Sequence, residues 1–453
     1  MQLEDIRDRI DHGPMGRLQV LVVAICVMCN MIDGFDILAA SFVSPILTRE
    51  WGLSEAVLGL LLSAGPMGMA VGAFTLSWVA DVYGRRTSML MCLGLMSVGM
   101  LASAAAHDVE LLIALRFITG LGVGTMASCT GTLVFEYSNR KARNLGLGLV
   151  TLGYPLGAIL GGIVSTWLIG ELGWRAVFVF GGLCSALLVP FVALRLPESL
   201  DYLIARKPRD ALGKVNRILA RLGLPGSAAL PADVRRPGGT RGNLVDLFRP
   251  PVLGRTVLMS LAYFFYMVSS YFILSWATQL TTDAGFSITE GLSISILINL
   301  GGVIGGIVIG ILSFKLPFKP LASATMLAMG LAIVAFGLFA KSLALVAAFS
   351  VLIGFGIFGA ALVLYAAAAQ TFPVWVRATG IGMSMSAGRV GSMIGPATAG
   401  FLLSAGLGRE AVCFVLALPV IASILFILRV PLAPVADRPE RDAPAAGTEP
   451  VSA

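Results

Sequence analysis

Twelve apolar segments, each long enough to cross a lipid bilayer, dominate this sequence of 453 residues. A spanning helix needs about 20 mainly apolar residues. The chain supplies such segments at 18–47, 56–80, 87–106, 110–135, 145–169, 176–195, 254–280, 287–312, 320–340, 343–369, 379–403 and 411–430. Charged residues make up only 13% of the chain, whereas a soluble domain carries about 25%. The sequence therefore predicts an all-α membrane protein with twelve transmembrane helices and excludes a water-soluble globule.

The segments fall into two groups of six, which divides the chain into five parts. These are a polar N-terminal tail (1–17), a first six-helix half (18–195), a polar central loop (196–253), a second six-helix half (254–430) and a C-terminal tail (431–453). The central loop contains KPRDALGKVNRILARLG, for which we expect short helices. The C-terminal tail is rich in Pro, Ala and charged residues, a composition that is typical of disorder.

The basic residues indicate which way the chain is oriented in the membrane. Most of the 32 Lys and Arg residues lie in the tails, in the central loop and in the short loops on the same side. Loops rich in Lys and Arg stay in the cytoplasm, so we expect both termini there. The excess of positive charge then reflects topology, and it does not indicate nucleic-acid binding.

An internal repeat relates the two halves. RNLGLGLVTLGYPLGAILG begins at Arg143 and RATGIGMSMSAGRVGSMIG begins at Arg377. The starting Arg and four glycines recur at the same spacing in both, namely Gly146, Gly148, Gly157 and Gly161, and Gly380, Gly382, Gly391 and Gly395. Transporters built from parallel repeats have two pseudo-symmetric halves, with the substrate site between them near the middle of the membrane. The repeat predicts this arrangement.

Two acidic residues, Asp33 and Asp36, interrupt the first apolar segment in the sequence MIDGFDIL. An ionised side chain in mid-bilayer costs roughly 2.5–3.5 kcal/mol, so such residues usually face a cavity and a partner. Residues three apart lie on one helical face, and like charges this close favour the protonated form of one carboxyl. Because the repeat places Met267 and Ser270 at the corresponding positions, the acids are not needed for the scaffold. They are candidates for a proton-binding site.

Two arginines also lie within predicted spans. Arg116 in the fourth span has a depth that allows an ion pair with Asp33 or Asp36, with either a functional or a purely structural role. Arg389 lies near mid-depth in the eleventh span, without an acid on its own helix. Its guanidinium could hold the carboxylate of an anionic substrate through two hydrogen bonds. Alternatively, it could pair with one of the two acids.

Polar side chains in other spans could bind the rest of a substrate. The candidates for reading ring substituents are Tyr154, Ser270, Asn299 and Tyr365. The seventh span is dense in aromatic residues, most of which we expect to pack against lipid or neighbouring helices. Neither a His/Cys/Asp metal cluster nor a nucleophile–base set is recognisable. We therefore expect no metal, no cofactor and no enzymatic activity.

Several motifs resemble the major facilitator superfamily. SWVADVYGRR (77–86) resembles the signature G-x-L-A-D-R-x-G-R-R between the second and third spans, with matches at Asp81, Gly84, Arg85 and Arg86. Ser77 and Val82 depart from that signature. RFITGLGVG (116–124) resembles the pattern of the fourth span. DGFD, FEYSNRKAR and YPLGAILGG are similar to segments of the aromatic acid:proton symporter family.

The resemblance implies a functional set and a mechanism. Within that family, the matching residues are Asp33, Asp36, Arg116, Glu136, Arg377 and Arg389. We expect Asp33, Asp36, Arg116 and Glu136 to couple protons, and Arg389, Arg116 and Asp36 to bind substrate together with the hydroxyl-reading candidates. Gating would involve Asp81, Gly84, Arg85, Arg86 and Arg377.

The expected protein is a proton-coupled symporter that imports an aromatic carboxylate, such as a hydroxybenzoate or benzoate, by alternating access. It would be a monomer in the inner membrane of a bacterium, with protons, the substrate and lipid as partners. A symporter of a sialate-, lactate- or nicotinate-type acid is an alternative with the same charges. A drug:proton antiporter is a weaker one, because Pro155 precedes Gly157, whereas the exporter motif has its proline after the glycine.

Overall fold

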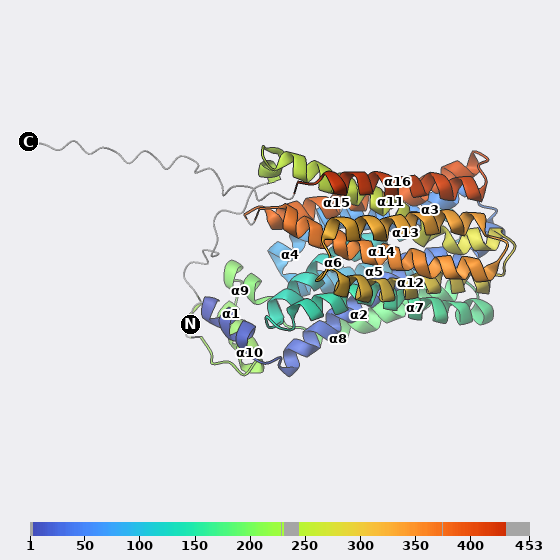
Figure 1. The fold of residues 1–453 in the computed structure, drawn as a ribbon. Coiled ribbons are helices and arrows are strands. Elements are labelled where there is room, and N and C mark those ends of the chain that lie inside the picture. Colours follow the sequence, from blue (N-terminus) through green and yellow to red (C-terminus); the bar gives the residue numbers. More distant parts are fainter. Residues whose placement is uncertain (1–2, 228, 231–243, 374, 432–453) are drawn as a thin grey trace, which may run out of the picture.

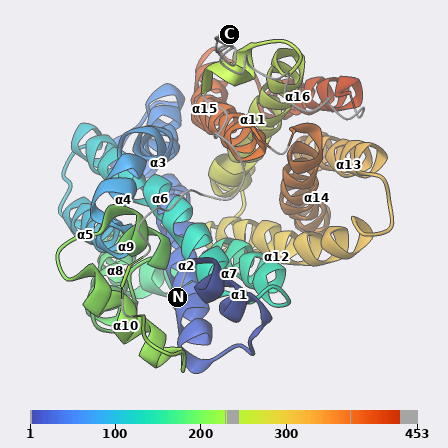
Figure 2. The same ribbon diagram turned by 90° about the vertical axis from the view of Figure 1, so that its left-hand side faces the viewer.

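In the described part of the computed structural model, twelve long helices form two bundles that lie side by side (Figures 1 and 2). The structure describes residues 3–431 except 228, 231–243 and 374, so most of the tail predicted to be disordered lies outside the described residues. The first bundle contains α2 (Arg17–Trp51), α3 (Glu55–Thr75) with its continuation α4 (Ser77–Tyr83), α5 (Arg85–Ala104), α6 (Val109–Tyr137), α7 (Arg143–Leu172) and α8 (Arg175–Arg195). The second contains α11 (Leu253–Asp283), α12 (Ile288–Leu312), α13 (Phe318–Leu338), α14 (Leu343–Thr371), α15 (Arg377–Ser404) and α16 (Arg409–Arg429).

The observed helices begin and end within a few residues of the predicted spans, which confirms the all-α fold with twelve spans. Eleven helical segments are long and apolar enough to cross a membrane by length and composition. The remaining one, α15, has 28 residues, but Arg389 and a series of Gly and Ser residues lower its hydropathy. The chain is a multi-pass membrane protein.

Local sequence signals set several helix ends. Ser54 and Asp108 accept hydrogen bonds from the backbone N–H groups of Val57 and Leu111, and so cap the N-termini of α3 and α6. Such caps satisfy donors that have no partner within the helix. Gly52 ends α2 in the left-handed conformation at φ 61°, which a glycine adopts without a steric cost. These signals turn the chain sharply between antiparallel helices.

The packing of the helices repeats between the two bundles. In the first bundle α2 packs on α7, α3 on α6, and α5 on α8; in the second, α11 packs on α15, α12 on α14, and α13 on α16. Two of the repeated glycines occupy equivalent crossings. A Cβ atom on Gly157 would lie 1.8 Å from the Met31 carbonyl oxygen, and one on Gly391 would lie 2.2 Å from that of Phe264. Glycine is therefore required where the first and fifth helices of each half touch backbone to backbone.

Short helices gather at one end of the molecule, which we call the terminal face because α1 (Leu3–His12) lies there. The other short elements are α9 (Leu200–Arg206), α10 (Ala211–Arg221) and the 3-10 helix η1 (Leu244–Phe248). Helix α10 confirms the helix predicted for the central loop, whereas α1 was not predicted.

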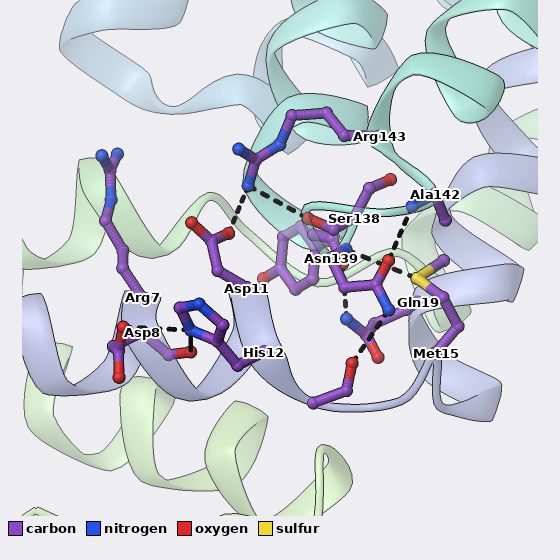
Figure 3. A network of polar contacts seen from close by, with 12 residues as sticks. Arg7, Asp8, Asp11, His12, Met15, Gln19, Ser138, Asn139, Ala142 and Arg143 are labelled. Carbon is purple, nitrogen blue, oxygen red and sulfur yellow. Dashed lines mark hydrogen bonds and ion pairs between the residues drawn. The ribbon is translucent and has the colours of Figure 1, made fainter.

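Hydrogen bonds and ion pairs tie α1 to the loop between α6 and α7 (Figure 3). Arg143 forms an ion pair with Asp11, and the Asn139 side chain donates to the Gly13 carbonyl at 2.8 Å. A second ion pair joins Arg7 of α1 to Asp201 of α9. The N-terminal segment is thereby fastened to the first half.

The two halves meet at the opposite face, away from α1. Ser41 of α2 donates a hydrogen bond of 2.6 Å to the Ser275 carbonyl of α11. Helices α3 and α15 pack together along this boundary, and a Cβ atom on Gly59 would lie only 2.9 Å from the Gly400 Cα. Because α3 begins at the opposite face and α15 ends there, these contacts close the molecule on that side.

Candidate functional site

The two acids of α2 are buried inside the first half. Asp33 and Asp36 are each 2% exposed, and none of their four carboxylate oxygens makes a hydrogen bond within the described part of the chain. A Cβ atom on Gly181 of α8 would lie 3.1 Å from an Asp36 oxygen, so this carboxyl group points toward α8. A buried carboxylate without a donor is strongly disfavoured, and this environment favours the binding of a proton.

Arg116 lies near Asp36 but is held by neutral groups. Its guanidinium donates to the Ser103 hydroxyl at 2.8 Å and to the Thr119 hydroxyl at 3.1 Å. It also contacts the Met100 sulfur at 2.9 Å and lies 4.8 Å from the centre of the Phe178 ring. Within the described residues, no ion pair of 4.0 Å or less joins Arg116 to either acid.

A small cavity joins Asp36 to Arg116. Both residues line it together with Leu61, Leu62 and Thr119, and its volume is about 10 Å³. This is close to the space that one water molecule needs, and far too small for an aromatic ring. A water could bridge the carboxyl group and the guanidinium, so the expected pair is close in space without direct contact. We refer to Asp33, Asp36 and Arg116 as the acid site.

Glu136 lies far from the acid site. Twenty residues separate it from Arg116 on α6, roughly 30 Å at 1.5 Å per residue. Its neighbours at the terminal face include Ser199, Arg85 and Asp201. The structure therefore does not bring Glu136 together with Asp33 and Asp36, although the sequence resemblance grouped the three.

The predicted gating residues of the first half form a compact set at the terminal face. Asp81 and Arg85 form an ion pair of 2.7 Å. Gly84 has φ 100°, and a Cβ atom on it would lie 2.4 Å from a Glu198 oxygen, which makes glycine necessary there. The Arg86 backbone N–H donates to Glu198 at 3.0 Å. Sequence reasoning missed Glu198, which follows α8 in the segment LPESL.

Arg377 begins α15 as Arg143 begins α7. Arg377 Nε donates to the Phe372 carbonyl at 3.3 Å, five residues back along the chain. In the first half, Arg143 donates to the Ser138 carbonyl at 3.2 Å, also five residues back. The repeat thus extends to the side-chain contacts of these two arginines, and both stabilise the turn before the fifth helix of their half.

Arg389 extends from the second half toward the first. Its guanidinium donates a hydrogen bond of 3.3 Å to the Gly124 carbonyl of α6. Tyr271 of α11 lies beside it, and the Tyr271 hydroxyl faces that of Tyr154 on α7. The rings of Tyr154 and Phe358 of α14 are 6.2 Å apart. We call Arg389, Tyr271, Tyr154 and Phe358 the interface site.

The interface site combines a half-buried cation with three aromatic side chains, and it lies where the two halves meet. Arg389, Tyr271, Tyr154 and Phe358 are each partly exposed rather than buried. Such a set can bind an anionic group through the guanidinium and a flat apolar ring through the aromatic faces. In the sequence, Tyr271 and Phe358 carried no signal that distinguished them from other aromatic residues of the spans.

The remaining hydroxyl-reading candidates lie in different surroundings. The Ser270 hydroxyl donates to the Tyr266 carbonyl at 2.9 Å and lies near Met329 of α13, so it faces the interior of the second half. The Asn299 amide donates to the Ser295 carbonyl, while its oxygen is buried without a partner in the described structure. Tyr365 is 51% exposed on α14. Among the described residues, no hydrogen bond joins Arg389 to any of these three.

Comparisons with known proteins agree with the fold and the motifs. The Major Facilitator Superfamily model matches residues 23–362 and, a second time, residues 259–452. A gallate transporter of Pseudomonas putida is 34% identical over 94% of this chain and 94% of its own length. The 4-hydroxybenzoate transporter PcaK of Pseudomonas aeruginosa is 32% identical over 92% of this chain and 93% of its own.

Among solved structures, the xylose transporter XylE of E. coli in an inward-open conformation has a similar fold. Its TM-score is 0.71 at 15% sequence identity, covering 91% of this chain and 96% of that one. The chain belongs to the major facilitator superfamily, and it is a membrane transporter rather than an enzyme. Within the superfamily it belongs to the family that contains the aromatic acid transporters, as the motifs predicted.

Proposed function

We propose that the protein is a proton-coupled symporter that imports an aromatic carboxylate, such as a hydroxybenzoate, benzoate or a related acid. The observation that carries this proposal is the interface site, where the Arg389 guanidinium lies among three aromatic side chains at the boundary of the two halves. A carboxylate would bind the guanidinium in place of the Gly124 carbonyl, and the ring would lie against Tyr154 and Phe358. The names of the similar transporters support this substrate class.

The acid site would supply the coupling. Asp33 and Asp36 are buried and have no hydrogen-bond donor within the described structure, so each is a candidate to take up a proton before the halves move. Proton binding would weaken the attraction of Asp36 for Arg116, and the small cavity between them would change its water content. Protons are then the only coupling ion, and neither a metal nor an organic cofactor takes part.

Alternating access would follow from rocking of the two halves. The contacts at Ser41 and Gly59 close the opposite face, and the Asp81–Arg85 ion pair belongs to the set that would close the terminal face in the other state. By the distribution of Lys and Arg, the terminal face is cytoplasmic. The protein would work as a monomer in the inner membrane of a bacterium.

Uptake in proteoliposomes under an imposed pH gradient tests this proposal. We expect labelled aromatic acids to accumulate when the outside is acidic, with gallate, 4-hydroxybenzoate and benzoate above lactate and sialate. Uptake of nicotinate would show whether the protein accepts aromatic carboxylates in general or only benzoates. Accumulation that ignores the pH gradient would contradict proton coupling, and a preference for lactate or sialate would contradict the aromatic substrate class.

A leucine at Gly400 is expected to impair transport by preventing closure of the opposite face. A Cβ atom at this position would lie 2.5 Å from the Glu55 carbonyl oxygen and 2.8 Å from the Gly59 Cα, so α3 and α15 would have to separate. Overpacking of this kind costs about 1–3 kcal/mol, so we expect the initial rate of uptake to fall about tenfold or more. Gly148→Leu is the matched control, because a Cβ atom on Gly148 meets no atom within 4 Å. Equal uptake by both variants would contradict a role for this crossing.

A further inference from the structure

A row of exposed leucines on α8 ends at a basic residue on the terminal face. Leu183, Leu187 and Leu194 are 50%, 73% and 80% exposed, and their spacing places them on one side of the helix. On a spanning helix, such an exposed apolar row meets the acyl chains of the bilayer. Arg195 follows Leu194 directly, ends α8 and is itself exposed. Its charge therefore lies where the acyl chains give way to the lipid headgroups.

Helix α10 brings further positive charge to the same place. The Arg221 guanidinium donates a hydrogen bond of 3.2 Å to the Arg195 carbonyl, so the last turn of α10 lies against the end of α8. Figure 2 shows α10 beside α8 at the outer edge of the first half. Because Arg195 marks the boundary of the apolar row, α10 lies beside the headgroup region of the leaflet that borders the terminal face.

The sequence of α10 gives this helix an apolar side and a basic flank. Val215 and Ile218 are buried against the first half. Lys214, Arg217 and Arg221 are exposed, and their spacing of three and four residues places them on one flank of the helix. Since Arg221 on this flank reaches the end of α8, the basic flank is turned toward the membrane boundary. No Asp or Glu occurs between the two ends of α10.

Three cations at this boundary have no acidic partner within the described residues. Arg217 forms an ion pair of 2.8 Å with Asp210. Arg195, Lys214 and Arg221 belong to none of the ion pairs in the described part of the chain. We call these three residues the basic rim. Like charges close together repel one another, so the rim favours an anion that lies between them.

We propose that the basic rim binds the phosphate groups of anionic phospholipids. Guanidinium and ammonium groups both form charge-assisted hydrogen bonds with phosphate oxygens. Clusters of Lys and Arg on an amphipathic helix, or next to the cytoplasmic end of a spanning helix, are typical of binding to anionic lipids. By the distribution of Lys and Arg, the leaflet concerned is the cytoplasmic one. The inference goes beyond transport and depends neither on the substrate nor on proton coupling.

The leucine row of α8 favours a lipid over a soluble anion. A phosphate on Arg195 would place the acyl chains of the same lipid along Leu194 and Leu187, which are the most exposed leucines of the row. Both ends of one amphipathic molecule then meet matching surfaces. A free phosphate or an acidic peptide would use the cations alone and would leave the leucines without a partner from the same molecule.

Native mass spectrometry of the purified full-length protein tests this site. The probes are phosphatidylglycerol, which is anionic, and phosphatidylcholine with the same acyl chains, which has no net charge. We expect half occupancy of the wild type at a phosphatidylglycerol concentration about tenfold below that of phosphatidylcholine. Each Lys or Arg near an anionic surface contributes about fivefold in affinity. In the variant Arg195→Gln/Lys214→Gln/Arg221→Gln, the concentration of phosphatidylglycerol at half occupancy should therefore rise about tenfold or more.

A matched variant controls for the loss of three positive charges. Arg9→Gln/Arg140→Gln/Lys141→Gln changes exposed residues of α1 and of the loop between α6 and α7, and we expect it to bind phosphatidylglycerol like the wild type. An equal loss in this control would overturn the rim, because net charge alone would then explain the binding. Unchanged affinity in the rim variant would overturn it as well.

Two further measurements distinguish the rim from altered packing and from a soluble ligand. Arg195→Lys/Arg221→Lys keeps every charge of the rim, so we expect most of the preference for phosphatidylglycerol to return. If this variant binds as weakly as the glutamine variant, the contact between α10 and α8 is responsible and the rim is not a phosphate site. Glycerol phosphate carries a phosphate without acyl chains. Displacement of the lipid by glycerol phosphate at an equal concentration would overturn the lipid assignment.

Discussion

Asp33→Asn is expected to abolish accumulation of a labelled aromatic acid against its gradient, while the protein stays folded in the membrane. The amide has nearly the shape of the carboxyl group, but it cannot take up and release a proton. A gradient of one pH unit provides about 1.4 kcal/mol per proton, which is roughly tenfold accumulation in the wild type. In the variant, internal and external concentrations should become equal.

Exchange of substrate across the membrane distinguishes a variant that has lost only proton coupling from one that can no longer bind or move the substrate. Because asparagine resembles a protonated aspartate, we expect Asp33→Asn to keep exchange of external label for internal unlabelled acid. Asp8→Asn, at an exposed position on α1, is the control and should accumulate substrate normally. If Asp33→Asn accumulates substrate like the wild type, the proton is carried elsewhere, and Asp36→Asn is the next variant to measure.

Arg389→Ala is expected to remove saturable uptake. A hydrogen bond to a charged group contributes about 1.5–3 kcal/mol, so losing two such bonds to the substrate carboxylate should weaken binding by about two orders of magnitude or more. Initial rates of uptake across a range of concentrations measure this loss. Arg389→Lys keeps the charge but not the two-pronged geometry, so we expect an intermediate defect.

Substrate analogues make the Arg389 prediction specific. If the guanidinium binds the carboxylate, competition by the methyl ester of 4-hydroxybenzoate should be weak in the wild type and similar in Arg389→Ala. Arg429→Ala, at the exposed end of α16, controls for loss of a positive charge in the same half. Unchanged affinity for the free acid in Arg389→Ala would show that the carboxylate binds elsewhere, with Arg116 as the remaining cation within the spans.

The depth of Arg116 in the fourth span predicted its pairing with the two acids only in part. Its distance from the end of the fourth span placed it level with Asp33 and Asp36, and the structure does bring Asp36 and Arg116 to one cavity. Among the described residues no direct ion pair joins them, and the guanidinium donates instead to Ser103 and Thr119 and contacts Met100. Ser103 and Met100 belong to α5, and the rise per residue of α6 contains no information about them.

Gly34 and Tyr154 show a second limit of prediction from the sequence. Glycine between two acids is compatible with either a bend or a close contact. The structure resolves this in favour of contact, because the Tyr154 backbone occupies the space of a Cβ atom. That contact also explains why a tyrosine from the fifth helix lies beside the acid site.

The sequence alone determined the number and approximate bounds of the helices, the two repeated halves and the identity of the buried charges. These properties are local, because hydropathy and the cost of burying a charge act at each residue and its neighbours along the helix. Only the tertiary structure decided which groups meet: Asp36 with Arg116 across a water-sized cavity, Glu136 far from both, and Tyr271 and Phe358 around Arg389. Those contacts join helices far apart in the chain, and they depend on backbone-to-backbone crossings that leave no periodic signal in the sequence.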